Sequence, residues 1–191
     1  MRITVKLVGI TGHVQHNIRL ADPDDEYVKL IRELNAKGQN KTEDDRKEIE
    51  RLEFLGGLYH EPDIGVYVPA ANLLRCMAKA GTITKRGKKI EQAISPMTDR
   101  IPLSYDGPRK PDDLFARPEF RFRMMVGIQR NRVVRMRPVF RQWSLDAELD
   151  LQTDVLSRSD FEAVLEQAGR AEGLGEARRI GMGRFMAETK L

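Results

Sequence analysis

Cysteine and histidine are scarce in this chain of 191 residues. The single cysteine, Cys76, excludes a disulfide framework and a zinc site built from cysteines. Cys76 stands among apolar residues at helical spacing, where a small buried thiol is expected. The three histidines come without carboxylates at ligand spacing, so we expect no metal and no other cofactor.

Long apolar runs are also missing. No stretch approaches the roughly 18 residues that a membrane-spanning helix needs. Residues 1–10 alternate between apolar and polar side chains, as in a strand, whereas a signal peptide has a continuous apolar block. We therefore expect a cytoplasmic protein with no membrane partner. A chain of this length can bury a sizeable core, in one domain that carries an insertion.

Charge is unevenly distributed. Residues 22–53 hold eleven acidic and seven basic side chains, whereas the remainder holds 18 acidic and 26 basic ones, a net charge of +8. Basic surface of that extent attracts polyanions, most commonly nucleic acid. The acidic segment contains two stretches at helical spacing, with Gly38 between them and Thr42 and Asp45 placed to cap the second. We interpret residues 20–62 as an inserted acidic helical hairpin.

The rest of the chain predicts an α+β fold. Its patterns follow the order strand, helix, strand, strand, helix, strand, in segments 2–10, 69–81, 120–128, 134–151, 159–169 and 184–187. That order is typical of the ferredoxin-like β-α-β-β-α-β core, which RNA-recognition motifs share. We predict a core of residues 1–19 and 63–191, within which residues 82–118 form a basic, proline-rich excursion and residues 90–94 a short helical turn.

The third and fourth of these segments predict a basic β-hairpin. Arg130 and Asn131 suit a tight turn between its strands. The apolar residues change parity between Met136 and Trp143, so the return strand is expected to break or bulge at Pro138.

Arginines concentrate in the hairpin. Eight lie within residues 117–141, opposed by Glu119 alone, and several fall on the strand face away from the core. The planar guanidinium binds phosphates and stacks on bases, and the scarcity of aromatics there favours backbone binding without sequence readout. Alternatively, some of these arginines pair with acids of the helical hairpin, from the same or a neighbouring subunit. With the basic loop at 82–89, the predicted nucleic-acid contacts are Lys85, Arg86, Lys88, Lys89, Arg121, Arg123, Arg132, Arg135, Arg137 and Arg141.

A glycine-rich stretch, G-L-G-E-A-R-R-I-G-M-G-R-F, separates the last helix from the last strand. Glycines open backbone conformations in which successive N–H groups bind an anion. Alternatively, the Gly-apolar-Gly pairs permit tight packing, with Leu174 and Met182 buried. The candidate binding residues are the glycines Gly173, Gly175, Gly181 and Gly183 and the arginines Arg178, Arg179 and Arg184.

Two Gly-apolar-Gly pairs separated by five residues that include arginine resemble the glycine-rich signature of the RAMP superfamily, the RNA-binding proteins of CRISPR systems. The stretch V-Y-V-P-A-A-N-L-L-R, residues 66–75, is similar more loosely to the start of that family's first helix. The resemblance implies a ferredoxin-like fold and a prokaryotic or phage protein from a CRISPR system or mobile element. It leaves the acidic hairpin unexplained.

The resemblance implies two alternative functions. A backbone subunit polymerises along single-stranded nucleic acid and binds without cutting, as a homo-oligomer, filament or multi-subunit ribonucleoprotein. The chain has room for one ferredoxin-like unit, which favours this function; RNA is favoured over single-stranded DNA, and guide and target remain open. The acidic hairpin of one subunit could dock on the basic surface of the next. The alternative is a metal-independent endoribonuclease with a histidine general base, His13 or His16, although both also fit a surface loop.

Overall fold

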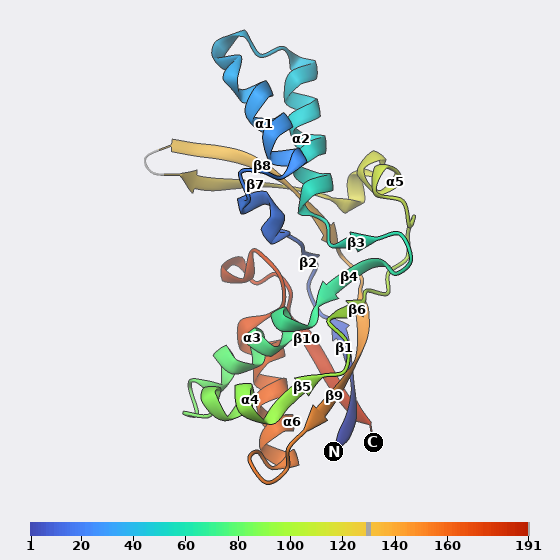
Figure 1. Cartoon of the computed structure of the whole chain (residues 1–191), viewed down its shortest axis with the longest axis vertical. Coiled ribbons are helices and arrows are strands. Elements are labelled where there is room, and N and C mark those ends of the chain that lie inside the picture. Colours follow the sequence, from blue (N-terminus) through green and yellow to red (C-terminus); the bar gives the residue numbers. More distant parts are fainter. Residues whose placement is uncertain (129–130, 191) are drawn as a thin grey trace. The chain divides into compact units, whose positions relative to one another are not determined.

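The computed structural model describes residues 1–128 and 131–190, which form two compact units (Figure 1). The core unit comprises Met1–His13, Glu61–Asp106 and Phe140–Leu191. The hairpin unit comprises Val14–His60 and Gly107–Val139. Arg130, predicted as a turn residue, lies outside the described residues. In the described ranges no helix is long and apolar enough to cross a membrane.

Each unit draws its elements from separate parts of the chain. The core unit contains β1 (Arg2–Gly9), β4 (Gly65–Pro69), α3 (Ala70–Gly81), α4 (Gly87–Ala93), β5 (Ile94–Pro96), β6 (Arg100–Pro102), β9 (Ser144–Leu151), α6 (Arg158–Gln167), η4 (Ala168–Glu172), η5 (Arg178–Ile180) and β10 (Phe185–Lys190). The hairpin unit contains η1 (Ile18–Ala21), α1 (Glu26–Ala36), η2 (Gly38–Asn40), α2 (Glu43–Gly57), α5 (Pro111–Ala116), η3 (Pro118–Phe120), β7 (Arg121–Ile128) and β8 (Asn131–Phe140). The two-residue strands β2 (His13–Val14) and β3 (His60–Glu61) lie where the units join in sequence.

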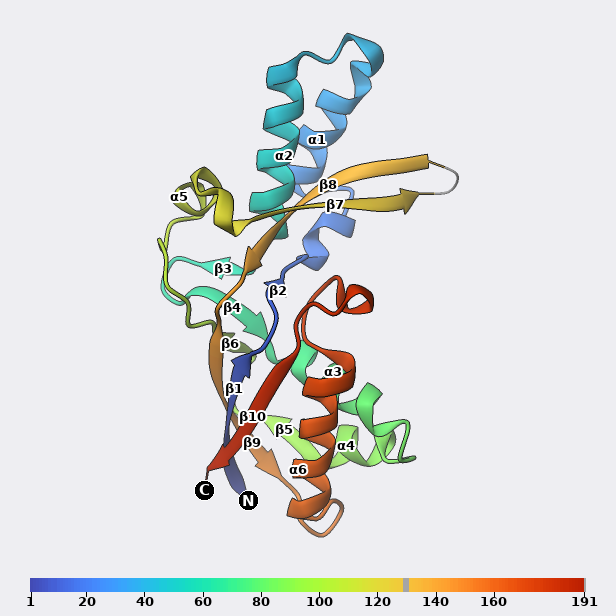
Figure 2. The ribbon, with the colours of Figure 1, turned by 180° about the vertical axis from the view of Figure 1, so that it is seen from behind.

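The main sheet of the core unit has four antiparallel strands in the order β10-β1-β9-β5. With α3 after β1 and α6 after β9, the strands of the β-α-β-β-α-β unit are ordered fourth, first, third, second. This is the ferredoxin-like arrangement, so the predicted fold class is confirmed. Figure 2 shows α3 and α6 side by side on one side of the sheet.

The second core strand is not the one that the sequence predicted. β5 pairs Ile94 with Leu151 and Pro96 with Leu149, although this region was expected to form only a helical turn. The strand predicted from residue 120 is β7, which pairs with β8 in a different sheet. Three residues give too short an alternation for periodicity to detect, and the longer β7 pattern was assigned in its place.

The predicted break at Pro138 is also wrong. β8 continues to Phe140, and Pro138 pairs with Arg121 within the ladder. The Pro138 carbonyl oxygen accepts a hydrogen bond from the Gln15 N–H (3.0 Å), which is the ladder bond that a proline can still make. The parity change instead falls in residues 141–143, between β8 and β9.

The two faces of the main sheet differ in chemistry. Alternate residues of β1 and β9 are buried, including Val5 and Ala147. On the other face, the register places Lys6 between Asp146 and Glu188, and β1, β9 and β10 present no aromatic ring there. RNA-recognition motifs bind bases on such a face through aromatic side chains. A phosphate-binding surface is therefore better sought at the loops and helices.

The hairpin unit contains the predicted helical hairpin, in which α1 packs against α2. α1 ends before Gly38, whose φ is +57°, and α2 begins after Thr42. The Thr42 hydroxyl accepts the Asp45 N–H (3.1 Å), and the Asp45 carboxylate accepts the Thr42 N–H (2.9 Å). The predicted cap is confirmed. The predicted domain boundaries stay a prediction, since compact packing does not show independent folding.

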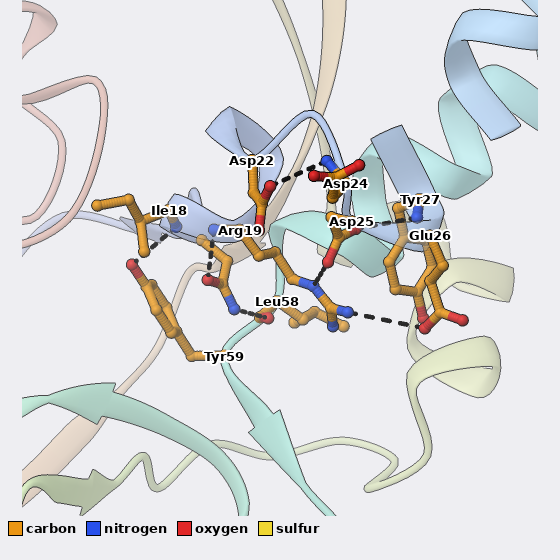
Figure 3. A network of polar contacts seen from close by, with 10 residues as sticks. Ile18, Arg19, Asp22, Asp24, Asp25, Glu26, Tyr27, Leu58 and Tyr59 are labelled. Atoms are coloured by element: carbon orange, nitrogen blue, oxygen red, sulfur yellow. Dashed lines mark hydrogen bonds and ion pairs between the residues drawn. The ribbon is translucent and has the colours of Figure 1, made fainter. Parts of the chain in front are cut away.

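The acids before α1 are occupied in a local polar network (Figure 3). Asp25 accepts hydrogen bonds from Arg19 Nε (2.7 Å) and from the Tyr27 N–H (2.9 Å). Asp22 accepts the Asp24 N–H (2.9 Å), and the Arg19 guanidinium lies over the Tyr27 ring. These contacts fix the entry into α1, so the acids here stabilise the fold.

Candidate nucleic-acid interface

The glycine-rich loop is built on four left-handed glycines. The φ angles are +76° at Gly173, +94° at Gly175, +86° at Gly181 and +74° at Gly183. A Cβ atom on Gly183 would lie 1.9 Å from the Leu174 carbonyl oxygen, so only glycine fits there. The Leu174 N–H donates to the Gly183 carbonyl (2.8 Å), and Leu174 is buried. The glycines therefore allow the two pairs to pack backbone against backbone.

Residues just after β1 hold this loop. The Thr11 hydroxyl donates to the Gly181 carbonyl (2.8 Å) and accepts the Arg184 N–H (2.9 Å). The Gly183 N–H donates to the Gly12 carbonyl (2.8 Å). These contacts join segments about 170 positions apart in sequence, so no local pattern could reveal them.

His13, a predicted general base, is buried against the same loop. Its Nδ1 atom lies 3.1 Å from the Leu174 carbonyl oxygen, which can only accept, so Nδ1 carries the proton. Burial lowers the pKa of His13 from 6.5 to about 4, which keeps the ring neutral at pH 7. The ring also lies against Trp143, at 5.2 Å between centroids. This environment fits a structural role for His13.

Helix α3 contacts the loop from another side through Cys76. The Cys76 thiol is buried, as predicted, and donates to the Gly173 carbonyl (3.1 Å). Burial raises the pKa of Cys76 to about 12; the charge of Glu172 adds to this effect, and the positive charges of Arg178, Arg184 and Lys79 oppose it. The thiol therefore stays protonated at neutral pH.

The three loop arginines have no ion-pair partner in the described parts of the chain. Arg178 and Arg179 begin η5, and Arg184 directly precedes β10. None of the three forms an ion pair with a residue in the ranges 1–128 and 131–190. The Arg184 Nη1 atom is buried and has no hydrogen-bond partner in those ranges. Buried guanidinium N–H groups are normally paired, so this atom is poised for an acceptor.

Two arginines of the β7–β8 hairpin, in contrast, form ion pairs with acids of α2. Arg135 bonds to Glu53, which is only 3% exposed and also accepts the Met136 N–H (2.8 Å). Arg123 pairs with Glu50 (2.9 Å). Pairing with acids of the same chain, one of the two alternatives raised by the sequence, is thus what the structure contains. These contacts tie β7 and β8 to α2.

The other arginines predicted as contacts in this region differ in their exposure and in their partners. Arg137 is 6% exposed, donates to the Met136 carbonyl (3.1 Å), and lies 3.4 Å from Nε2 of the exposed His16. Arg121 lies over the Phe115 ring. Arg132 and Arg141 are exposed and have no ion pair among the described residues.

The basic loop after α3 is largely exposed. Lys85 has a φ of +57°, and Lys88 and Lys89 lie on α4. Arg86 pairs with Asp160 (2.9 Å). Within the described ranges, no three His, Cys, Asp or Glu side chains group as a metal site requires.

Two contributors were missed by the sequence analysis. Lys79 of α3 lies near the loop and pairs with Glu172 (2.7 Å), and Thr11 anchors the loop. The period of α3 places Lys79 on an exposed face, which is a weak signal. Nothing local marks Thr11.

Comparison with known proteins identifies no family. No protein-family model and no curated protein matches the chain. One similar solved structure is a chain in a cryo-EM structure of Type III-B Cmr-beta bound to cognate target RNA. The TM-score is 0.45 at 11% identity; the match covers 98% of this chain and 61% of that chain, less than two-thirds of its length. A similarity of this size supports no conclusion about function.

Proposed function

We propose that this protein binds single-stranded nucleic acid, RNA in preference to DNA, through the phosphate backbone and without cleaving it. The observation that carries the proposal is a set of three arginines, Arg178, Arg179 and Arg184, that form no ion pair with the described residues and stand on a glycine-rich loop held by hydrogen bonds. Guanidinium groups bind phosphate oxygens in a fork geometry. The acidic side chains and lack of aromatics on the open sheet face favour the loop over the sheet as the site.

We further propose a RAMP-type backbone subunit that acts in a homo-oligomer or a multi-subunit ribonucleoprotein. A ferredoxin-like core with the glycine-rich loop between its last helix and last strand supports this proposal. The exposed cations Lys85, Lys88, Lys89, Arg132 and Arg141 are proposed as additional contacts. Cleavage is not part of the proposal: of the two candidate bases, His13 is buried and its ring anchors the loop, and His16 belongs to the hairpin unit, whereas the loop belongs to the core unit.

The test is a binding titration of a fluorescent single-stranded oligoribonucleotide in chelator at several salt concentrations. The variant replaces Arg178, Arg179 and Arg184 by Gln, and a control replaces Arg32, Arg46 and Lys47 of the helical hairpin by Gln. The site variant should lose affinity at least about tenfold, and its log K against log salt slope should shrink by about 2, or about 0.7 per phosphate contact. The control removes equal charge and should retain the slope. Equal effects, or RNA cleavage in chelator, would reject the proposal.

A further inference from the structure

The Thr11 side chain bonds to the first residue of the second glycine pair, Gly181, and to the residue after the pair, Arg184. Its hydroxyl donates to the Gly181 carbonyl (2.8 Å) and accepts the Arg184 N–H (2.9 Å). Its N–H donates to the Arg184 carbonyl (3.2 Å), and its carbonyl accepts the Trp143 indole N–H (2.8 Å). The hydrogen-bonding groups of Thr11 are therefore all engaged, and all but the carbonyl bond to the loop.

The residue that Thr11 holds most closely is Arg184. The Arg184 backbone is bonded on both its N–H and its carbonyl, which also accepts the Ile10 N–H (2.8 Å). Its side chain is half-buried, and the buried Nη1 atom has no acceptor within residues 1–128 and 131–190. A rigid backbone thus carries a guanidinium that still needs an acceptor, and a phosphate oxygen is a suitable one.

A second guanidinium lies in the same neighbourhood. Arg178 stands on the same loop as Arg184, and the charges of both, like that of Glu172, act on the Cys76 thiol of α3. Neither is neutralised by an acid in the described part of the chain.

We propose that Thr11 is a positioning residue for phosphate binding. By fixing the backbone at Gly181 and Arg184, it holds the Arg184 guanidinium in place to bind a phosphate of a single strand. This inference rests on the proposed function and adds to it a residue that itself touches no ligand. Thr11 is uncharged, so its replacement alters no long-range attraction, and a change in salt dependence would report a lost arginine–phosphate contact.

The test compares Thr11→Val, which removes the hydroxyl at nearly equal volume, with Thr11→Ser, which keeps it. Affinity for a single-stranded oligoribonucleotide is measured against salt, and melting curves confirm that each variant is folded. Thr11→Val should lose affinity by about tenfold, which is the loss expected when the hydrogen bond between the charged Arg184 guanidinium and the phosphate is broken. Its slope should shrink by about 0.7, equivalent to one phosphate contact. Thr11→Ser should restore both values.

A double-mutant cycle with Arg184→Gln tests whether Thr11 affects RNA binding through Arg184. If Thr11 acts through Arg184, Thr11→Val should cause little further loss in the Arg184→Gln background. Independent, multiplicative losses would overturn the inference, as would a folded Thr11→Val variant with wild-type affinity and slope. The positioning role alone fails if the wild type binds RNA and the triple arginine variant binds more weakly, but Thr11→Val binds as well as the wild type. If the wild type does not bind, the proposed function fails with it.

Discussion

The glycine-rich loop and the β7–β8 hairpin both carry arginines, but different groups hold them in place. Uncharged groups fix the loop, among them the Thr11 hydroxyl and the His13 imidazole. The hairpin is fixed by its arginines, because Arg135 bonds to the buried Glu53 and Arg123 to Glu50. An arginine whose charge is already balanced by a nearby carboxylate attracts a phosphate less strongly than one without such a partner. The number of arginines in a segment therefore does not measure its capacity for a polyanion.

The same difference bears on assembly. Charge asymmetry predicts that the acidic hairpin of one subunit docks on the basic surface of the next. In the structure, Glu50 and Glu53 engage arginines of their own chain, so such a contact would have to use other acids. Head-to-tail assembly stays a prediction, and its charge complementarity is smaller than the composition suggests.

Breaking the buried pair of the hairpin should have the largest effect. Glu53→Ala leaves Arg135 without its partner and the Met136 N–H without an acceptor, at an expected loss of about 3 kcal/mol in the free energy of unfolding. Urea denaturation followed by circular dichroism measures this loss. Glu48→Ala on the same helix removes a more exposed pair with Arg51 and should cost less than about 1 kcal/mol. Equal losses would show that burial does not increase the contribution of the Glu53–Arg135 pair to stability.

Acid should loosen the loop through His13. Because burial lowers the His13 pKa from 6.5 to about 4, the unfolded chain binds a proton between these values that the folded chain does not. The stabilisation is fully present above pH 6.5 and is lost as the pH falls toward 4, by about 3 kcal/mol at most. Denaturation at a series of pH values checks this. His13→Asn keeps an N–H donor and does not titrate, so its profile should be flatter; parallel profiles would contradict the assignment.

Two glycines offer a matched comparison of the regions. Gly183 has a φ of +74° and no room for a Cβ, so Gly183→Ala should cost about 2 kcal/mol or more and weaken RNA binding. Gly127 in β7 faces open space, and Gly127→Ala should change stability by about 0.5 kcal/mol or less, in the stabilising direction. Thermal unfolding of the two variants measures the difference in stability between them. Tolerance of both substitutions would mean that the loop is not rigid.

The sequence predicted most of the fold because much of it follows local rules. The alternation in β1, the Thr42 cap and the element order identified the ferredoxin-like core and the helical hairpin. Local rules fail for β5, which is too short to show a period. They fail again for the candidate site: the sequence reveals the loop arginines, but it does not reveal that they form no ion pair with an acid among the residues that the structure describes. That property depends on where the acids fold, as does the link from Thr11 to Arg184.

The smallest expected effect tests whether a hairpin arginine can become a ligand contact. Arg123 is exposed and Glu50 is half-buried, so Glu50→Gln should lower stability by about 1 kcal/mol or less. It also frees Arg123 for phosphate, so RNA affinity at low salt should rise and the salt slope should steepen by up to about 0.7.

The control for this variant is Glu43→Gln, which makes the same charge change at the start of α2, beside Lys47. A larger gain for Glu50→Gln than for Glu43→Gln would show that Glu50 masks an arginine capable of binding. Equal gains would mean that only net charge matters, and Arg123 would then serve the fold alone. In that case the loop and the hairpin would differ more clearly in function. Pairing with an acid of the same chain would keep an arginine from binding phosphate even where the pair is weak and only partly buried.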